Sequence, residues 1–350
     1  MTTPAELEMK TPPPEVRPVP GSVTAALPAT SEVKVGTRVE TTSVLGLFLG
    51  LLAATCYSIT NIGLRQLSGV RDSMGWDLWI CGIKALPTVL ITMWLLIRLQ
   101  RKGHNLIPSP KLLCVLILTA FMMQFGGNFG FQLALRSVGL AVSVPIVFAS
   151  IICSGALAGR IALGDPVGVR TGISMALMVA SIVFLSVGAQ QATAVDAAAS
   201  ALPSSTTMGV LAGVICGTIS GIAYGLGGVV IRRATRTSVP VPTILFIFGI
   251  VGLLTLCPLG AIPLGLEGLA AITPVDWGFL LGAGLFNAGG FFAITYALRY
   301  LNVNKANVMN AAQNAMCALA GFTLFAEPMT AMTLTGIALT ITGLLILGRR

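Results

Sequence analysis

A row of side-chain amides is the first feature of this sequence that could bind a ligand. It lies in the apolar segment 302–326 and consists of Asn307, Asn310, Gln313 and Asn314. The three asparagines are spaced i, i+3 and i+7, so they share one face of an α-helix. An amide that faces lipid is costly, and the row should therefore point into a helix bundle or a water-filled cavity.

A second amide row lies in segment 112–135, where Gln124, Asn128 and Gln132 are spaced i, i+4 and i+8. Either row could line a hydrogen-bonding site for a polar substrate. Hydrogen bonds between side-chain amides of neighbouring helices, worth about 0.6 kcal/mol each in membranes, would also explain both rows. Three asparagines exceed what one helix contact needs, which favours a binding role for the row in 302–326. Lesser candidates, since a tyrosine in a helix interface is common, are Tyr57, Asn61 and Tyr224.

Lys84 is the basic residue that lies deep inside an apolar segment. It comes about eight residues into 76–99, roughly 12 Å from the start of a helix that rises 1.5 Å per residue. A cation at that depth should pair with an acid or meet an anion. The acidic residues Asp77, Asp165 and Glu327 all lie near segment ends. We therefore favour contact with a substrate carboxylate or phosphate over a structural ion pair.

The composition is that of a membrane protein. Charged residues make up 9% of the 350 residues, apolar residues make up 55%, and the mean hydropathy is +0.90. Soluble domains carry about 25% charged residues. The net charge of +9 does not indicate nucleic-acid binding, because the basic residues lie between apolar segments and form no stripe.

Residue types that support catalysis or metal binding are scarce. The seven cysteines lie in apolar segments without a C-x-x-C pair, and the single histidine, His104, lies in a polar loop. No pair of acids lies at depth, and no Walker A sequence occurs. We therefore expect no metal, no cofactor and no enzymatic activity. Without a carboxylate or histidine at depth, exchange or facilitated movement is as compatible with the sequence as proton-driven transport.

Ten apolar segments of about 20 residues each could cross a bilayer. They follow a Pro-, Thr- and Glu-rich tail, 1–42, which we expect to be disordered. A polar stretch, 189–207, is the expected linker between two halves, 43–188 and 208–348. The ten segments are 43–66, 76–99, 112–135, 139–163, 167–188, 208–232, 240–264, 275–298, 302–326 and 330–347.

The basic residues predict the orientation of these segments. If both termini are cytoplasmic, seventeen of the 21 Lys and Arg residues fall on the cytoplasmic side and three on the other side. This asymmetry follows the positive-inside rule and supports an even number of spans. With no targeting signal in the tail, we expect a prokaryotic cytoplasmic membrane.

The chain carries an internal duplication. Each half has an amide two residues before a Gly pair, then Ala-Leu-Arg, and later an acid followed by Pro. In the first half these are Gln124, Gly126-Gly127, Ala134-Leu135-Arg136 and Asp165-Pro166; in the second they are Asn287, Gly289-Gly290, Ala297-Leu298-Arg299 and Glu327-Pro328. Each acid and proline should form a turn and stabilise a helix N-terminus. Because corresponding segments are five spans apart, the copies should be inverted, as in alternating-access transporters.

These repeated sequences resemble the EamA-like transporters of the drug/metabolite transporter superfamily. The stretch from Phe325 to Thr330 resembles that family's acidic turn, and Gly164-Asp165-Pro166 is a weaker version of it. Lys84 lies where many members carry an arginine. The resemblance covers 43–348 and implies ten helices, paired repeats and export or exchange of small metabolites. It implies no particular substrate.

We therefore predict an all-α polytopic membrane protein whose ten transmembrane helices form two inverted five-helix repeats. Its expected function is secondary transport of a small polar metabolite, as an efflux carrier or exchanger. A channel or facilitator is the main alternative, and a membrane-embedded enzyme is a weaker one. The expected partners are a small-molecule substrate and the lipid bilayer, without nucleic acid, and a homodimer is compatible with the sequence.

Overall fold

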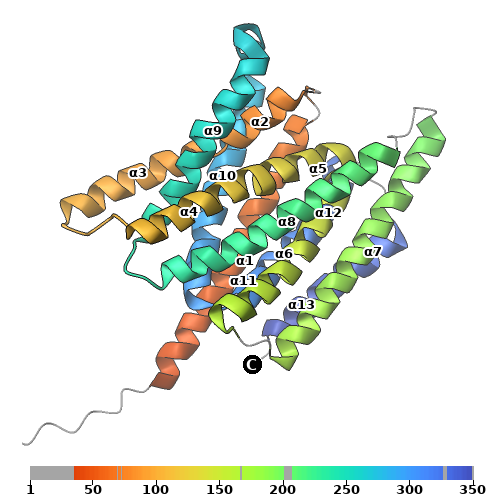
Figure 1. Ribbon diagram of the computed structural model, residues 1–350. Coiled ribbons are helices and arrows are strands. Elements are labelled where there is room, and N and C mark those ends of the chain that lie inside the picture. Colours follow the sequence, from red (N-terminus) through yellow and green to blue (C-terminus); the bar gives the residue numbers. More distant parts are fainter. Residues whose placement is uncertain are drawn as a thin grey trace, which may run out of the picture.

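A computed structural model of the chain describes residues 35–68, 70–71, 73–165, 168–200, 207–325 and 329–348. Within these residues the secondary structure is helical, without a strand, and the helices lie side by side in a bundle (Figure 1). Seven helical stretches of this part are long and apolar enough to cross a membrane, which confirms an all-helical membrane protein. Two shorter apolar helices are Gly172–Ser181 and Ala331–Gly343.

The described residues of the first half of the chain form eight helical elements. They are α1 (Val35–Ser68), α2 (Met74–Ile83), α3 (Leu86–Arg101), α4 (Pro110–Met122), the π-helical η1 (Met123–Phe129), α5 (Gly130–Val138), α6 (Leu140–Leu163) and α7 (Val169–Ser200). The second half forms α8 (Thr207–Thr235), α9 (Val241–Ala270), α10 (Pro274–Tyr300), α11 (Val303–Asn310), α12 (Gln313–Phe325) and α13 (Ala331–Gly348).

Two boundaries differ from the expected ones. Helix α1 begins at Val35, inside the tail expected over 1–42, and residues 1–34 lie outside the described part. Helix α7 continues to Ser200, inside the linker expected over 189–207, and residues 201–206 also lie outside it. The Thr-rich and Ala-rich flanks are compatible with helix, so hydropathy alone placed both ends too close to the apolar centre.

Three expected continuous segments are interrupted near their centres. Segment 76–99 divides into α2 and α3 at Lys84-Ala85, where Pro87 in the first turn of α3 lacks the N–H that a continuous helix needs. Segment 112–135 contains η1, which includes the first Gly pair. Segment 302–326 divides into α11 and α12 at Ala311-Ala312. There the Gln313 side chain donates to the Asn310 carbonyl at 3.3 Å.

Glycines bring α8 close to α6. Gly213, Gly217, Gly221 and Gly225 recur every four residues along α8 and form one row on its surface. A Cβ on Gly221 would collide with the Val147 carbonyl oxygen, and the others in the row also face near neighbours from the first half. Small residues at this spacing let helices in membranes approach each other closely.

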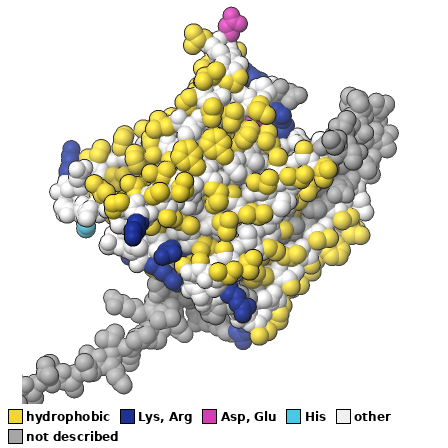
Figure 2. Space-filling model, viewed as in Figure 1, with side chains coloured by type: hydrophobic (Ala, Val, Ile, Leu, Met, Phe, Trp, Pro, Cys, Tyr) yellow, Lys and Arg dark blue, Asp and Glu magenta, His cyan; other side chains and the backbone are white. Residues whose placement is uncertain are grey.

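The surface of the described bundle is largely apolar. In Figure 2 a broad hydrophobic face lies between patches of Lys and Arg at the margins of the view. Large exposed apolar side chains on several helices include Leu90, Leu118, Leu157, Leu254 and Leu285. An apolar surface of this extent is expected where lipid tails cover the protein.

The packing of α8 predicts the effect of filling its glycine row. Gly221→Ala should destabilise the protein by about 2 kcal/mol, because the new methyl group must displace a backbone carbonyl of α6. Gly228→Ala on the same helix is the control, since a Cβ there meets no atom within 4 Å and removes a helix-destabilising glycine. Thermal unfolding in detergent measures both variants. Equal melting temperatures would contradict the packing described above.

Candidate functional site

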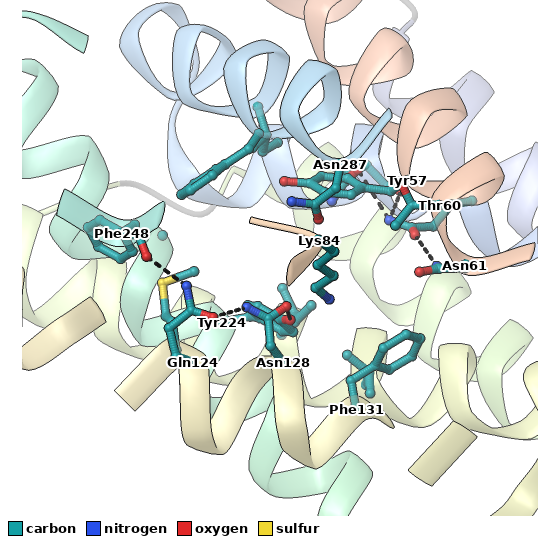
Figure 3. Close-up of a pocket in the computed structure, with 18 of the residues that line it drawn as sticks. Tyr57, Thr60, Asn61, Lys84, Gln124, Asn128, Phe131, Tyr224, Phe248 and Asn287 are labelled. Carbon is teal, nitrogen blue, oxygen red and sulfur yellow. Dashed lines mark hydrogen bonds between the residues drawn. The ribbon is translucent and has the colours of Figure 1, made fainter. Parts of the chain in front are cut away.

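A cavity of about 150 Å³ lies where the three interrupted helices meet. Side chains from both halves of the chain line it, and Figure 3 shows several of them converging on one space. Lys84 lies at the α2–α3 break, Gln124 and Asn128 lie in η1, and Asn310 and Gln313 flank the α11–α12 break. Helix interruptions and π-helical turns are frequent at functional sites.

The cavity brings together nine of the eleven residues singled out from the sequence. They are Tyr57, Asn61, Lys84, Gln124, Asn128, Tyr224, Asn307, Asn310 and Gln313. Asn314 does not line it, because the break after Asn310 rotates the next turn away from the face that the asparagines were expected to share. Asn314 is buried, and its amide has no hydrogen-bond partner among the described residues. A substrate-binding role for the nine stays a prediction.

One wall of the cavity is a directed chain of hydrogen bonds. The Tyr224 hydroxyl donates to Asn128 Oδ1 at 2.7 Å, and Asn128 Nδ2 donates to Gln124 Oε1 at 2.6 Å. Gln124 Nε2 then donates to the Phe248 carbonyl in α9 at 2.7 Å. A Cβ on Gly252 would lie only 2.5 Å from that nitrogen, so a glycine leaves room for the Gln124 amide. These three hydrogen bonds hold η1, α8 and α9 together and fix the orientation of the Asn128 and Gln124 amides.

A second amide chain lies on the opposite side. Asn61 Nδ2 donates to Gln313 Oε1 at 3.0 Å, and Gln313 Nε2 donates to the carbonyl and side-chain oxygens of Asn310 at 3.3 Å each. Asn307 also lines the cavity, and its Nδ2 has no hydrogen-bond partner within the described part of the chain. Most amides of the cavity join helices, as the structural interpretation of the sequence predicts. Asn307 Nδ2 is a buried donor left unused, as the substrate-binding interpretation requires.

Lys84 is 4% exposed, and its side chain extends into the space near Asn128 and Phe131 (Figure 3). Among the described residues that line the cavity, Lys84 is the one with a charged side chain. No described acid lies within ion-pair distance of it. Asp77 of α2 instead forms an ion pair with Arg136 at 2.8 Å and accepts a hydrogen bond from Gln132 at 3.3 Å. That contact gives Gln132 a structural role outside the cavity.

Each tyrosine of the site packs on a glycine of the other half. A Cβ on Gly127 would lie 3.0 Å from the Tyr224 ring, and a Cβ on Gly290 would lie 3.1 Å from the Tyr57 ring. The Gly pairs found in the sequence therefore admit aromatic rings beside the cavity, in agreement with the close packing that glycine permits.

Several lining residues were not proposed from the sequence. Polar ones are Thr60, Thr88 and Asn287, and a large apolar share comes from Phe131, Val147, Phe148, Ile151, Phe248 and Phe291. Asn287 could have been found, because it is the repeat counterpart of Gln124. The apolar residues carry no signal that distinguishes a cavity wall from a lipid-facing or packed surface.

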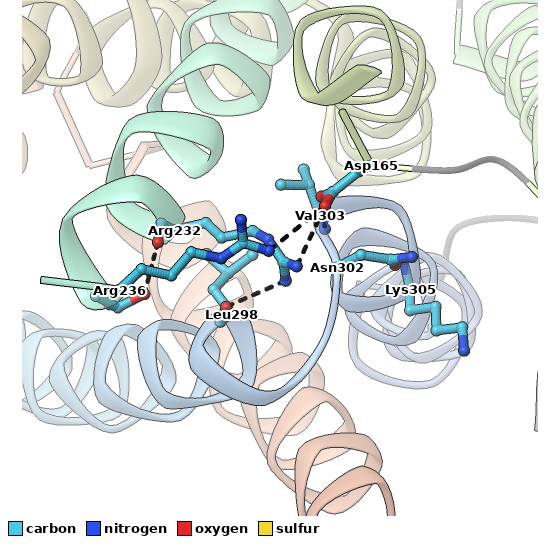
Figure 4. Close-up of polar contacts among 8 residues, drawn as sticks. Asp165, Arg232, Arg236, Leu298, Asn302, Val303 and Lys305 are labelled. Carbon is cyan, nitrogen blue, oxygen red and sulfur yellow. Dashed lines mark hydrogen bonds and ion pairs between the residues drawn. The ribbon is translucent and has the colours of Figure 1, made fainter. Parts of the chain in front are cut away.

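Asp165 lies outside the cavity in a second polar cluster (Figure 4). Its carboxylate is 3.2 Å from Arg232 and 3.6 Å from Arg236, and it accepts from the Val303 backbone N–H at 3.3 Å. Arg232 also donates to the Leu298 carbonyl at 3.3 Å. The carboxylate therefore stabilises the N-terminus of a helix, as the sequence predicted, and that helix is α11. The equivalent Glu327-Pro328 lies outside the described residues.

Metal-binding clusters of three or more His, Cys, Asp or Glu residues are absent from the described part of the chain. The predictions of no metal and no cofactor rest on the sequence.

Comparison with known proteins supports the family resemblance. Residues 211–349 match the sequence model of the EamA-like transporter family. No curated protein matches the chain in sequence. A solved structure described as "Crystal structure of protein" is similar in fold, with a TM-score of 0.59 and 13% identity. That match covers 87% of this chain and 96% of the other.

The hydrogen-bond chain predicts that Tyr224 and Asn128 are coupled. In a double-mutant cycle, Tyr224→Phe and Asn128→Ala should show a coupling energy of about 0.6–1.7 kcal/mol, the range found for side-chain bonds in membranes. Tyr57→Phe with Asn128→Ala is the control, because no bond joins those two side chains in the described structure. The coupling energies are obtained from free energies of unfolding measured in detergent. Equal coupling energies in the two cycles would contradict the hydrogen bond between Tyr224 and Asn128.

Proposed function

We propose that this chain, whose residues 211–349 match the EamA-like transporter family, is a secondary transporter. It moves a small polar metabolite across the membrane by alternating access, as an exporter or exchanger. The polar cavity at the junction of three interrupted helices carries this proposal. In secondary transporters, discontinuous helices meet at the substrate site between two repeats.

Contacts exchanged between the halves support an inverted repeat. Gly126 and Gly127 approach Ala223 and Tyr224, while their counterparts Gly289 and Gly290 approach Cys56 and Tyr57. Both sets of partners are separated by the same 167 positions (56 to 223 and 57 to 224). The Gly pair of each half therefore contacts the equivalent position in the first helix of the other half. A two-fold relation of this kind is expected when two five-span copies face each other.

Further contacts from α1 and α8 agree with this relation. A Cβ on Gly213 of α8 would meet Val138, and one on Gly46 of α1 would meet Leu301. Val138 and Leu301 each lie two residues after the Arg of Ala-Leu-Arg in their own half. The pairing covers both the ends and the centre of the helices, so it supports repeats that correspond over their whole length.

Contacts near the helix ends support the ten-span topology. The Thr243 hydroxyl donates to the Leu106 carbonyl, and both residues lie on the predicted cytoplasmic side. Arg71 donates to the Gly268 carbonyl, and both lie on the predicted external side. Asp165 and Arg232 likewise share the cytoplasmic side. One span too many or too few between Arg71 and Gly268 would place at least one of these pairs on opposite faces.

Two ion-paired clusters lie on opposite sides of the cavity in this topology. Asp165 with Arg232 joins α6, α8 and α11 on the cytoplasmic side, and Asp77 with Arg136 joins α2 and α5 on the external side. Both carboxylates are buried, so separating either one from its arginine inside the protein would leave a costly unpaired charge. Alternating access then requires the two clusters to separate in turn.

Cys81 offers a test, because its thiol lines the cavity. In a variant that keeps Cys81 and replaces the other six cysteines, a membrane-impermeant maleimide would be added to vesicles of known orientation. Asp165→Asn should increase the ratio of cytoplasmic to external labelling by about tenfold, which corresponds to 1.4 kcal/mol. Asp77→Asn should shift the ratio the opposite way.

The matched pair of variants separates a transporter from a channel. A channel would be labelled from both sides at once, and either substitution would raise labelling from both sides together. A cysteine-free protein gives the background. Reciprocal shifts support alternating access, and parallel shifts overturn it in favour of the channel.

A further inference from the structure

The charge of the cavity identifies the kind of substrate that would complete it. Lys84 is buried at the α2–α3 break, and no acid lines the cavity within the described residues. The nearest acid along α2, Asp77, already has Arg136 and Gln132 as partners. A buried ammonium without a counter-ion is costly, and an anionic ligand would offset that cost.

The hydrogen-bonding capacity left in the cavity also favours an anion. Asn128 donates one amide N–H to Gln124, and Gln124 donates one amide N–H to the Phe248 carbonyl. The Thr88 hydroxyl and Asn307 Nδ2 line the cavity, are buried, and have no hydrogen-bond partner within the described chain. Together with Lys84 they supply unused donors, and a carboxylate is a pure acceptor that would satisfy such donors.

The number of charges limits the choice of anion. A single cation with no acid beside it balances one negative charge. A phosphate monoester would bring a second negative charge without a partner. A zwitterion or an organic cation would bring a positive charge that no lining carboxylate of the described chain could match.

The size and apolar lining limit the rest of the molecule. A cavity of about 150 Å³ holds a body of roughly the size of benzene. Nucleotide sugars and other large metabolites exceed it in this conformation. Phe131, Val147, Phe148 and Ile151 form an apolar wall from α5 and α6, so the body of the ligand should be apolar on that side.

We propose that the cavity binds a small monocarboxylate with an apolar body. Its carboxylate would contact Lys84, and its body would pack against the apolar wall formed by Phe131, Val147, Phe148 and Ile151. This inference rests on the proposed function, since it assigns the substrate class of the same site. Thr88 and Asn307 are the neutral donors that would orient the carboxylate.

Four probes of nearly equal shape would test the charge. They are phenylacetate, phenylacetamide, 2-phenylethylammonium and phenyl phosphate, each added to the detergent-purified full-length protein in a thermal-shift titration. A ligand that binds the native state raises the melting temperature according to its concentration and dissociation constant. Each probe is compared on wild type, Lys84→Gln and Lys84→Arg. Lys305→Gln is the control, because it removes one exposed positive charge from α11, outside the cavity.

Phenylacetate should bind wild type and Lys305→Gln most tightly of the four probes. Lys84→Gln should weaken phenylacetate about 10- to 100-fold, the effect of removing one charged hydrogen-bond partner, and Lys84→Arg should restore most of the affinity. Unliganded Lys84→Gln should melt at or above the wild-type temperature, because it removes an unpaired buried charge. A lower melting temperature, or failure to fold, would make Lys84 a structural residue and overturn the proposal.

The other outcomes are also decisive. Equal binding of phenylacetamide and phenylacetate would overturn the anionic class, and preference for phenyl phosphate would overturn the single charge. Binding of none of the four would overturn the proposed size and class. The reciprocal Cys81 labelling uses no ligand, so these results would leave alternating access standing, whereas parallel labelling would remove alternating access without touching the binding data.

Discussion

The structure depends on the need to satisfy polar groups away from water. A helix that is interrupted inside an apolar bundle exposes backbone groups that lipid cannot bond. At the α11–α12 break the Gln313 side chain bonds the Asn310 carbonyl, and Asn61 of α1 then bonds Gln313. The amides are therefore the partners that make an interruption tolerable. The same need places them where the helices open and a cavity forms.

Close packing by glycine determines where that cavity lies. Gly127 and Gly290 admit the rings of Tyr224 and Tyr57, and each ring belongs to the opposite half. The hydroxyl of Tyr224 reaches Asn128 because its ring lies against η1. A larger residue at Gly127 would push α8 away and break the bond chain that ends at Phe248. The backbone packing and the polar lining are thus parts of one arrangement.

The sequence predicted the helical class, most of the helix positions and nine of the residues that line the cavity, since hydropathy and amide spacing are local signals. It did not predict the interruptions. A break within a helical pattern depends on a tertiary partner such as Asn61, which periodicity cannot detect. Asn314 was misplaced for that reason. The partners of Asp165 were also missed, because Arg232 and Val303 are distant in the chain and meet only after folding.

The distribution of acids explains why the centre of the protein remains positive. Asp77 and Asp165 are held by arginines near the helix ends, and Asp276 is held in a capping box with Thr273 at the start of α10. Moving Asp77 or Asp165 to the centre would neutralise Lys84 but would remove the ion pair with Arg136 or with Arg232. The ends and the centre of the described bundle are therefore linked. The buried ion pairs near the helix ends keep their carboxylates away from the cavity, and under the proposal made above the negative charge that balances Lys84 comes from a ligand.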